Sequence, residues 1–253
     1  MTSTSPTTNP LHNQNVIVTG GATGIGYGIA EAFALQGANV AIGSRRPEIV
    51  QQAVSKLQAS ASGRVIGFTL DVTDRENSNA FVQDVLKTLG SVDILVNAAG
   101  VNIKNRSMAE MLPEQWDQVL AINATGAYNL IHASLPAMRH RQAGLIINIS
   151  SVTGKRALAL GGVAYAASKF AMTALGTCVA NEVGPEGIRV TNIYPGEVDT
   201  PILDQRPVPV TTEQREKILR PSDVGQIVVS IASLPARAHI PELVIKPVHQ
   251  SYF

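Results

Sequence analysis

Residues 19–26 read TGGATGIG, between a short apolar segment, Asn15–Thr19 (NVIVT), and an apolar run with helical spacing at 26–36. Glycine tolerates positive φ angles, and its backbone can approach a ligand closely. Where a strand passes into a helix, free backbone amides and the positive helix end favour a phosphate group. The spacing Gly-x-x-x-Gly-x-Gly differs from the common Gly-x-Gly-x-x-Gly, and a plain tight turn is the alternative. The position between strand and helix nevertheless predicts a pyrophosphate site.

Short apolar segments alternate with longer segments of helical spacing along the rest of the chain. The expected strands are Asn15–Thr19, 39–43, 64–70, 92–97, 145–150, 188–194 and 243–246. The expected helices are 26–36, Pro47–Gln58, 74–89, 113–140, 162–184 and 222–233. The strands are apolar throughout, as is typical of parallel strands covered on both faces. The order predicts an α/β fold, a single Rossmann-type domain over 14–253 with a doubly wound parallel sheet of about seven strands and helices on both faces.

Length and composition exclude several classes of protein. The chain has 253 residues, of which 45% are apolar, and a formal net charge of +1. This length suits one large domain, and the small charge gives no sign of a nucleic-acid partner. No apolar run approaches the roughly 20 residues that span a bilayer, so we expect no membrane contact. Residues 1–13, rich in Ser, Thr, Asn and Pro, are expected to form a disordered tail.

The cysteine and histidine content bears on redox state and metals. The single cysteine, Cys178, excludes a disulfide within one chain and favours a reducing, cytoplasmic compartment. We expect Cys178 to pack as an apolar residue on its helix, not to act as a nucleophile. The five histidines are scattered without ligand spacing, so we expect no catalytic metal.

The end of the second expected strand distinguishes between two cofactors. An acid there would bind the ribose 2′-hydroxyl of NAD, whereas an arginine accommodates the 2′-phosphate of NADP. The chain has Ser44, Arg45 and Arg46 and no acid at this point. Arginine pairs well with phosphate through its forked guanidinium. The alternative is that both arginines are solvated surface charges. We expect NADP(H), with NAD(H) as a possible substitute.

Tyr165 and Lys169 are four residues apart in an expected helix, so both side chains should lie on one face. A lysine ammonium beside a phenol favours the phenolate, which would lower the tyrosine pKa from about 10 toward neutrality. Such a phenol can give a proton to a carbonyl oxygen or take one from an alcohol. The pair alone is a weak signal, but together with the glycine turn it indicates a nicotinamide-dependent oxidoreductase.

Further motifs follow in order, and the chain resembles the short form of the short-chain dehydrogenase/reductase family over residues 14–203. The matching residues are Gly20, Thr23, Gly24, Ile25 and Gly26 in the glycine turn, Asp71 and Val72, Asn97, Ala98 and Gly100, Asn123, Ser151, Tyr165, Lys169, Pro195, Gly196, Val198 and Thr200. The resemblance implies that all of these except Asn123 and Ser151 bind the cofactor. They add to Ser44, Arg45 and Arg46, which are predicted from their position after the second expected strand.

The resemblance also implies catalytic roles. Ser151 would bind the substrate oxygen, and Tyr165 would transfer the proton. Lys169 would lower the tyrosine pKa and bind the nicotinamide ribose, while Asn123 would hold a water on a proton path. Adjacent strand residues face opposite ways, so only one of Ser150 and Ser151 can reach the site. Asn123 could instead mark a helix kink, because asparagine is a poor helix former.

The implied activity is hydride transfer between nicotinamide and a ketone/secondary alcohol pair. A non-catalytic NADP-binding sensor or assembly protein on the same fold is the main alternative, and an epimerase or dehydratase is another. A short substrate loop is expected at about 201–220, with further walls from 101–111 and 155–163. Cations in these walls could meet an anionic substrate or could simply be solvated. They are Lys104, Arg106, Lys155 and Arg156.

The expected helices 113–140 and 162–184 are apolar over more than one stripe. A helix that is apolar nearly all round must be buried on more than one side. One side can face the sheet and the other a second subunit. Members of the resembled family commonly assemble through these two helices, so we expect a homotetramer or homodimer.

Overall fold

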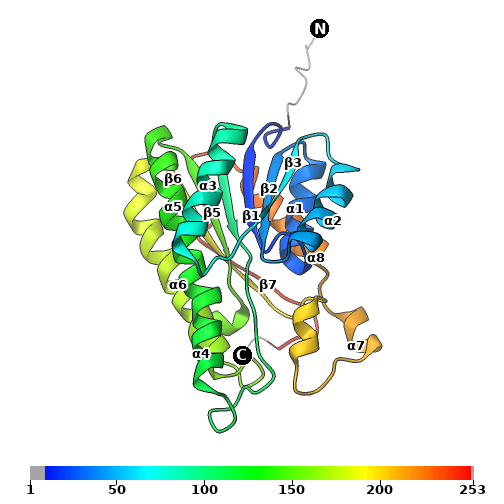
Figure 1. The fold of residues 1–253 in the computed structure, drawn as a ribbon. Coiled ribbons are helices and arrows are strands. Elements are labelled where there is room, and N and C mark those ends of the chain that lie inside the picture. Colours follow the sequence, from blue (N-terminus) through cyan, green and yellow to red (C-terminus); the bar gives the residue numbers. More distant parts are fainter. Residues whose placement is uncertain (1–8, 252–253) are drawn as a thin grey trace.

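The computed structural model describes residues 9–251, and it contains one seven-stranded sheet. All neighbouring strands are parallel, in the order β3-β2-β1-β4-β5-β6-β7 (Figure 1). The strands are β1 (Asn15–Thr19), β2 (Asn39–Ser44), β3 (Val65–Thr69), β4 (Ile94–Asn97), β5 (Gly144–Ile149), β6 (Ile188–Pro195) and β7 (Glu242–Ile245). The sheet confirms the predicted doubly wound fold. Its strand order reverses between β1 and β4, which is where ligands bind in such sheets.

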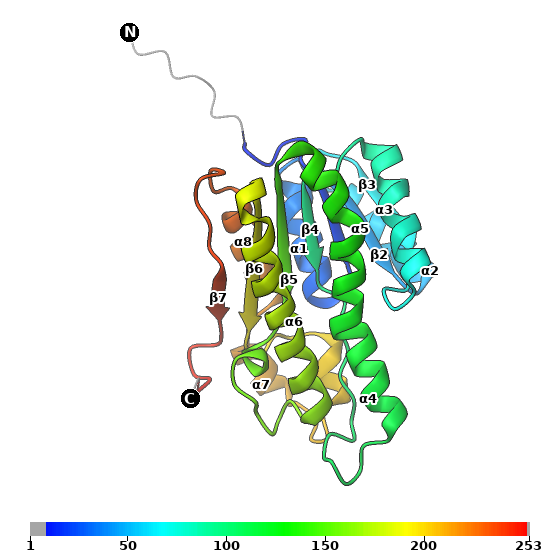
Figure 2. The same ribbon diagram turned by 90° about the vertical axis from the view of Figure 1, so that its left-hand side faces the viewer.

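Helices cover both faces of the sheet (Figures 1 and 2). One layer holds α1 (Gly24–Leu35), α2 (Pro47–Gln58) and α8 (Pro221–Ala232), whose buried apolar residues join one core cluster. The other layer holds α3 (Arg75–Leu89), α5 (Gly126–Arg141) and α6 (Val163–Val183), which share the second cluster. Strands between two such layers must be apolar on both sides, which explains the continuous apolar segments of β1, β4 and β5.

The two edge strands differ from the expectation that strands are covered on both faces. In β3 and β7 buried or half-buried residues alternate with exposed ones. Each edge strand has a neighbour on one side only, and the helix layers do not extend fully over it. Alternation is the pattern of a strand with one solvated face.

The expected helix 113–140 is not continuous. It consists of α4 (Pro113–Leu120), a π-helical turn η1 (Ala121–Thr125) and α5. The wider turn contains Asn123, whose side chain is fully buried. Single π turns inside α-helices are often found at functional sites. The sequence reasoning also missed α7 (Thr212–Lys217), which begins with a capping box between Thr211 and Gln214.

Helix α6 has one buried side and one exposed apolar side. Residues 163–186 are long and apolar enough to cross a membrane by length and composition, although the helix packs against β6 and carries the buried Lys169. Phe170 and Cys178 are exposed on it. The expectation that Cys178 is packed was therefore wrong, because its position on the helix faces outward.

Candidate active site

The glycine turn lies at the carboxyl end of β1, against the segment that follows β4. Gly20 has φ +65°, and a Cβ there would lie 2.9 Å from the Cα of Ala99. A Cβ on Gly26 would lie 2.3 Å from the carbonyl oxygen of Gly20, so α1 begins in close contact with the turn. Thr19 fixes the arrangement, since its Oγ1 accepts hydrogen bonds of 3.1 Å from both Ala98 N and Ala99 N.

The amino end of α1 suits an anion. Its N-cap residue, Thr23, makes no side-chain cap, and the first turn contains no acid. The first amides of a helix have no partner inside the helix, so here they are free for a ligand. A side chain on Gly24 would meet Thr200 at 3.4 Å, which brings the glycine turn next to the turn after β6. These residues fit the pyrophosphate of a dinucleotide.

Ser44, Arg45 and Asp71 mark the ends of β2 and β3, beside the glycine turn. Ser44 is half-buried, while Arg45 and Arg46 are exposed. Burial would raise the pKa of the Asp71 carboxyl, but hydrogen bonds from Thr73 and the charge of Arg45 hold that pKa below its usual value. The structure thus brings Arg45 close to the residue expected at the adenine ring. The side chain of Val72 is packed in the core, which leaves only its backbone for a cofactor.

A row of asparagines crosses three neighbouring strands, β4, β5 and β6. Asn97 donates to Asn148 at 3.0 Å, and Asn148 donates to Asn192 at 3.1 Å. Asn192 in turn donates to the carbonyl oxygen of Thr173 on α6 at 3.2 Å. A Cβ on Gly176 would lie 2.1 Å from Asn192 Oδ1, so the helix lies directly on this row. The row therefore sets the position of α6, and with it that of Tyr165 and Lys169.

Asn97 has one buried oxygen without a partner, Oδ1. Buried polar atoms are nearly always hydrogen-bonded, so such an atom beside a glycine turn is consistent with a site that a ligand completes. Asn97 lies at the end of β4, next to Ala98 and Gly100. All three were predicted to bind the cofactor.

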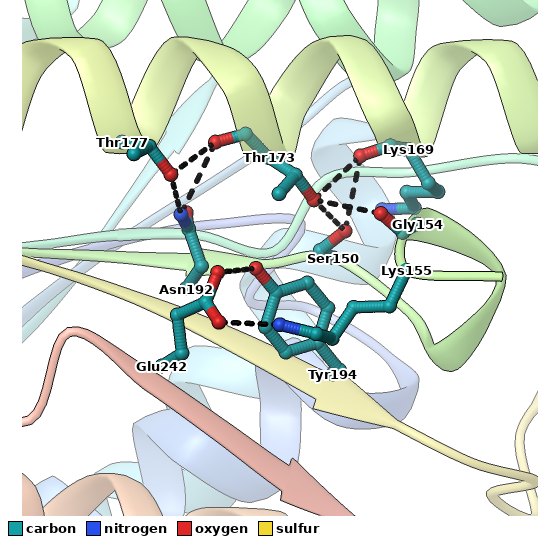
Figure 3. Close-up of polar contacts among 9 residues, drawn as sticks. All are labelled: Ser150, Gly154, Lys155, Lys169, Thr173, Thr177, Asn192, Tyr194 and Glu242. Atoms are coloured by element: carbon teal, nitrogen blue, oxygen red, sulfur yellow. Dashed lines mark hydrogen bonds and ion pairs between the residues drawn. The ribbon is translucent and has the colours of Figure 1, made fainter. Parts of the chain in front are cut away.

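Ser150 and Ser151 have different surroundings, and Figure 3 shows those of Ser150. Ser150 faces α6, where its Oγ donates to the carbonyl oxygen of Lys169 at 3.2 Å and lies 3.1 Å from Thr173 Oγ1. Ser151 caps the short helix η2 (Val152–Gly154) and is hydrogen-bonded to the phenol of Tyr165. The structure therefore pairs Ser151, and not Ser150, with the tyrosine.

The pKa of Tyr165 differs from the expectation. Burial raises the pKa of the phenol above 10, and the hydrogen bond from Ser151 and the charge of Arg106 offset this only in part. The prediction that the pKa of Tyr165 is lowered toward neutrality was wrong for the protein without cofactor. Burial of the phenolate away from water raises the pKa more than the neighbouring positive charge lowers it. The phenol is therefore protonated at neutral pH.

Lys169 lies under the tyrosine on the same face of α6. Its Nζ is 5.7 Å from the centre of the Tyr165 ring and donates to the carbonyl oxygen of Ile149 at 2.8 Å. The side chain is only 4% exposed. Burial lowers the pKa of Lys169 to about 8. A Cβ on Gly100 would lie 3.6 Å from Nζ, so the lysine is also next to the predicted cofactor segment after β4.

Asn123 joins three segments of the site. Its Oδ1 accepts from Val101 N at 2.8 Å, and its Nδ2 donates to Val101 O at 3.0 Å and to Ser168 Oγ at 2.9 Å. Both amide hydrogens are therefore used within the protein. These contacts do not test the expected role as a water holder, which stays a prediction. The side chain ties the segment after β4 to α6, through the wider π turn that carries it.

The turn after β6 closes the site from the other side. An inner pocket of about 150 Å³ brings Ser151 and Tyr165 together with Pro195, Gly196 and Val198. Gln250 also lines this pocket, and its Oε1 accepts from Glu197 N at 2.9 Å. Gln250 was missed by the sequence reasoning, because nothing in the sequence near the carboxyl end shows that it returns to this turn.

An ion-pair cluster joins the serine turn to the edge of the sheet (Figure 3). Lys155, which follows η2, pairs with Glu242 on β7, and its Nζ lies 4.5 Å from the centre of the Tyr194 ring. Tyr194 donates to Glu242 at 2.7 Å. The hydrogen bond from Lys155, followed by that from Tyr194, lowers the pKa of the Glu242 carboxyl. Lys155, named above as a possible anion contact, is thus already paired.

Among residues 9–251, no group of three or more His, Cys, Asp or Glu side chains could hold a metal ion. The candidate site consists of a glycine turn, a buried lysine and a serine–tyrosine pair at the carboxyl ends of the central strands.

Comparisons with known proteins agree with this geometry. The profile of the short chain dehydrogenase family matches residues 14–208. An uncharacterized oxidoreductase of Staphylococcus saprophyticus is 31% identical over 94% of the chain and 99% of its own length. A metagenomic short-chain oxidoreductase in complex with NADP is similar in structure, with a TM-score of 0.81, 31% identity, and coverage of 94% of this chain and 99% of that one.

A 3-oxoacyl-[acyl-carrier protein] reductase from Brucella melitensis with bound NAD has a TM-score of 0.82 and 30% identity, over 96% of this chain and 95% of that one. The family profile covers most of the chain, and the relatives match over nearly their whole length. The chain is therefore a member of the short-chain dehydrogenase/reductase family, an oxidoreductase family whose fold binds nucleotides.

Proposed function

We propose that this protein transfers a hydride between NADP(H) and a ketone/secondary alcohol pair, with Tyr165 as the acid or base. The observation that carries the proposal is the hydrogen-bonded Ser151–Tyr165 pair, which opens into the pocket formed with Pro195 and Gly196. A protein that only binds a dinucleotide needs neither this serine nor the phenol. The buried Lys169 lies beside the pair, where its charge can also act on the Tyr165 phenol.

The residues of the pocket suit proton transfer at a carbonyl oxygen. When bound, the nicotinamide supplies or accepts the hydride. Ser151 and Tyr165 can both donate hydrogen bonds to the substrate oxygen, and so stabilise the alkoxide as it forms. Tyr165 then gives its proton, which it holds at neutral pH because burial raises its pKa. The positive charges of Arg106 and Lys169 stabilise the phenolate that remains.

The preference for NADP(H) rests on the end of β2. Ser44, Arg45 and Arg46 provide hydroxyl and guanidinium donors there, and no acid follows the strand to bind a free ribose hydroxyl. Exposed guanidinium groups suit a 2′-phosphate, which is itself exposed and doubly charged. Relatives with bound NADP and with bound NAD both occur, so NAD(H) remains a possible substitute.

The test is loss of 340 nm absorbance by NADPH with a panel of ketones, for wild type and Tyr165→Phe. Loss of a general acid costs about 10²–10⁴-fold in rate, so the variant should show a drop of that size in kcat. NADPH binding, followed by its fluorescence, should be retained by the variant, because the ring remains. Equal turnover by the two proteins would contradict the role of Tyr165.

We also propose that the protein is a homodimer or homotetramer in the reducing environment of the cytoplasm. The exposed apolar side of α6 includes Phe170 and the free thiol of Cys178. An apolar helix face of this kind is typical of a protein interface. A second copy packed on α5 and α6 would cover it. Light scattering at micromolar concentration should give a mass of two or four chains, and a monomer would refute the assembly.

A further inference from the structure

A second, larger hollow lies next to the inner pocket. It has a volume of about 1170 Å³ and is open to solvent. The two hollows share four lining residues, Arg106, Leu158, Leu160 and Arg206. A molecule whose carbonyl group reaches Ser151 and Tyr165 can therefore extend into this outer cavity past a common wall.

The wall of the outer cavity is mainly apolar. Its apolar side chains come from the segment before α6, from the first turns of α6 and from the loop after η4 (Pro201–Gln205). They include Leu158, Leu160, Val163, Phe170, Val208 and Val210. Leu160 is 52% exposed and Val208 is 76% exposed. Large exposed apolar groups that converge on a cavity mark a ligand-binding surface more often than an accidental one.

The arginines of the shared wall are already engaged with the protein. Arg106 donates to the carbonyl oxygens of Ile103 at 2.7 Å and Gln205 at 3.0 Å, and also to that of Leu160. Arg206 pairs with Glu197 at 2.8 Å. Arg106 thus holds together the three loops that form the cavity, and neither arginine is held ready for a ligand. The other polar residues of the wall are exposed to solvent, namely Lys104, Asn105, Ser107, Glu110 and Gln214. Along the apolar part of the wall a sugar or polyol would lose water without gaining hydrogen-bond partners, which is unfavourable.

We infer that the substrate of the proposed reductase is a ketone with an extended apolar tail, which lies in the outer cavity while the carbonyl group occupies the inner pocket. This inference rests on the proposed function and narrows it. The cavity volume of about 1170 Å³ exceeds what a short ketone needs, and it is slightly above the roughly 300–1,000 Å³ of pockets that enclose drug-sized ligands. Burial of the tail against the leucine and valine side chains of the wall supplies the binding energy, without a contribution from Phe170, which the proposed second subunit would cover.

The inference is tested with 2-butanone and 2-octanone, which share a reacting group and differ by four methylenes. Each buried methylene should raise kcat/KM by about two- to fourfold, so 2-octanone should be favoured at least about tenfold by wild type. Val208→Asp puts a charge into the cavity wall and should reduce this ratio at least threefold. Val248→Asp is the matched control, because Val248 is fully exposed and does not line either hollow.

A second measurement separates this inference from the proposed function. Saturation-transfer NMR records contact between the protein and the tail protons of 2-octanone without any turnover. If no ketone is reduced but the tail signal is present and is weakened by Val208→Asp alone, the reductase proposal fails while the apolar site stands. The inference is overturned if wild type shows a 2-octanone to 2-butanone ratio of kcat/KM near one and no tail signal. A second subunit that fills the cavity would produce this result. Equal effects of the two aspartate variants also overturn it.

Discussion

The inner pocket and the outer cavity are adjacent, but they are built in different ways. The two side chains proposed to react in the inner pocket, Ser151 and Tyr165, lie just after β5 and on α6, and the polar residues that support them make their hydrogen bonds inside the protein. Asn123 and Lys169 are at most 4% exposed. The outer cavity is formed by three loops and the first turns of α6, and its side chains are largely exposed. Chemistry that needs fixed geometry is placed on regular elements, and recognition of a particular substrate is left to loops.

The two regions also differ in what holds them. Several independent hydrogen bonds fix the inner pocket: those of Asn123 to Val101 and Ser168, and the row from Asn97 to Asn192. In the outer cavity one side chain, Arg106, makes three of the hydrogen bonds between loops, and Asn102 adds one to the carbonyl oxygen of Gly161. Changes in the inner pocket should therefore lower kcat, whereas changes in the cavity wall should alter kcat/KM between substrates.

The largest expected effect on the inner pocket, in contrast to the outer cavity, comes from a change at Lys169. Its pKa of about 8 means that the side chain is protonated below pH 8 and neutral above it. The charge stabilises the Tyr165 phenolate, so kcat/KM for reduction should be level below pH 8 and should fall about tenfold per pH unit above it. Tyr165 does not contribute to this fall, because burial raises its pKa above 10.

The variant Lys169→Met should lack this fall and should lose about 10²–10⁴-fold in kcat at pH 7. Lys56→Met, which removes an exposed lysine on α2, is the control and should keep the wild-type profile. If the rate of Lys169→Met still falls above pH 8, another group carries the titration. The charge of the buried Lys169 would then not control the pH dependence of catalysis in the inner pocket.

Much of the fold followed from hydrophobic periodicity and from the glycine turn. All seven strands and the six long helices lie within a few residues of the predicted ranges, apart from the division of 113–140. That division could not be predicted, because a π turn depends on contacts of Asn123 with Val101 and Ser168. These partners are distant in sequence, so local sequence preferences around Asn123 cannot predict the contacts.

The site was predictable where residue types are locally diagnostic. Tyr165 and Lys169 are one helical turn apart, so their common face follows from spacing alone. Their pKa values were not predictable in the same way, because they depend on burial by the whole fold. The same holds for Arg106, which sequence reasoning offered only as a possible anion contact. The most distant of its three carbonyl partners, Gln205, lies 99 residues away in the sequence.

The smallest expected effect is that of Arg45 on NADPH binding. It extends the contrast between buried catalytic residues and exposed recognition residues to the cofactor site. Like the wall of the outer cavity, Arg45 is exposed at the end of an element, so it should choose between ligands without affecting catalysis. Arg45→Gln should weaken NADPH binding about tenfold, the value of one hydrogen bond to a charged group, and should leave NADH binding unchanged. Fluorescence titration with both cofactors measures this, with Arg237→Gln, another exposed arginine, as control. A similar loss for NADH would show that Arg45 supports the whole cofactor site. Exposed residues would then contribute to the fixed geometry of the inner pocket, and the division between buried chemistry and exposed recognition would not hold.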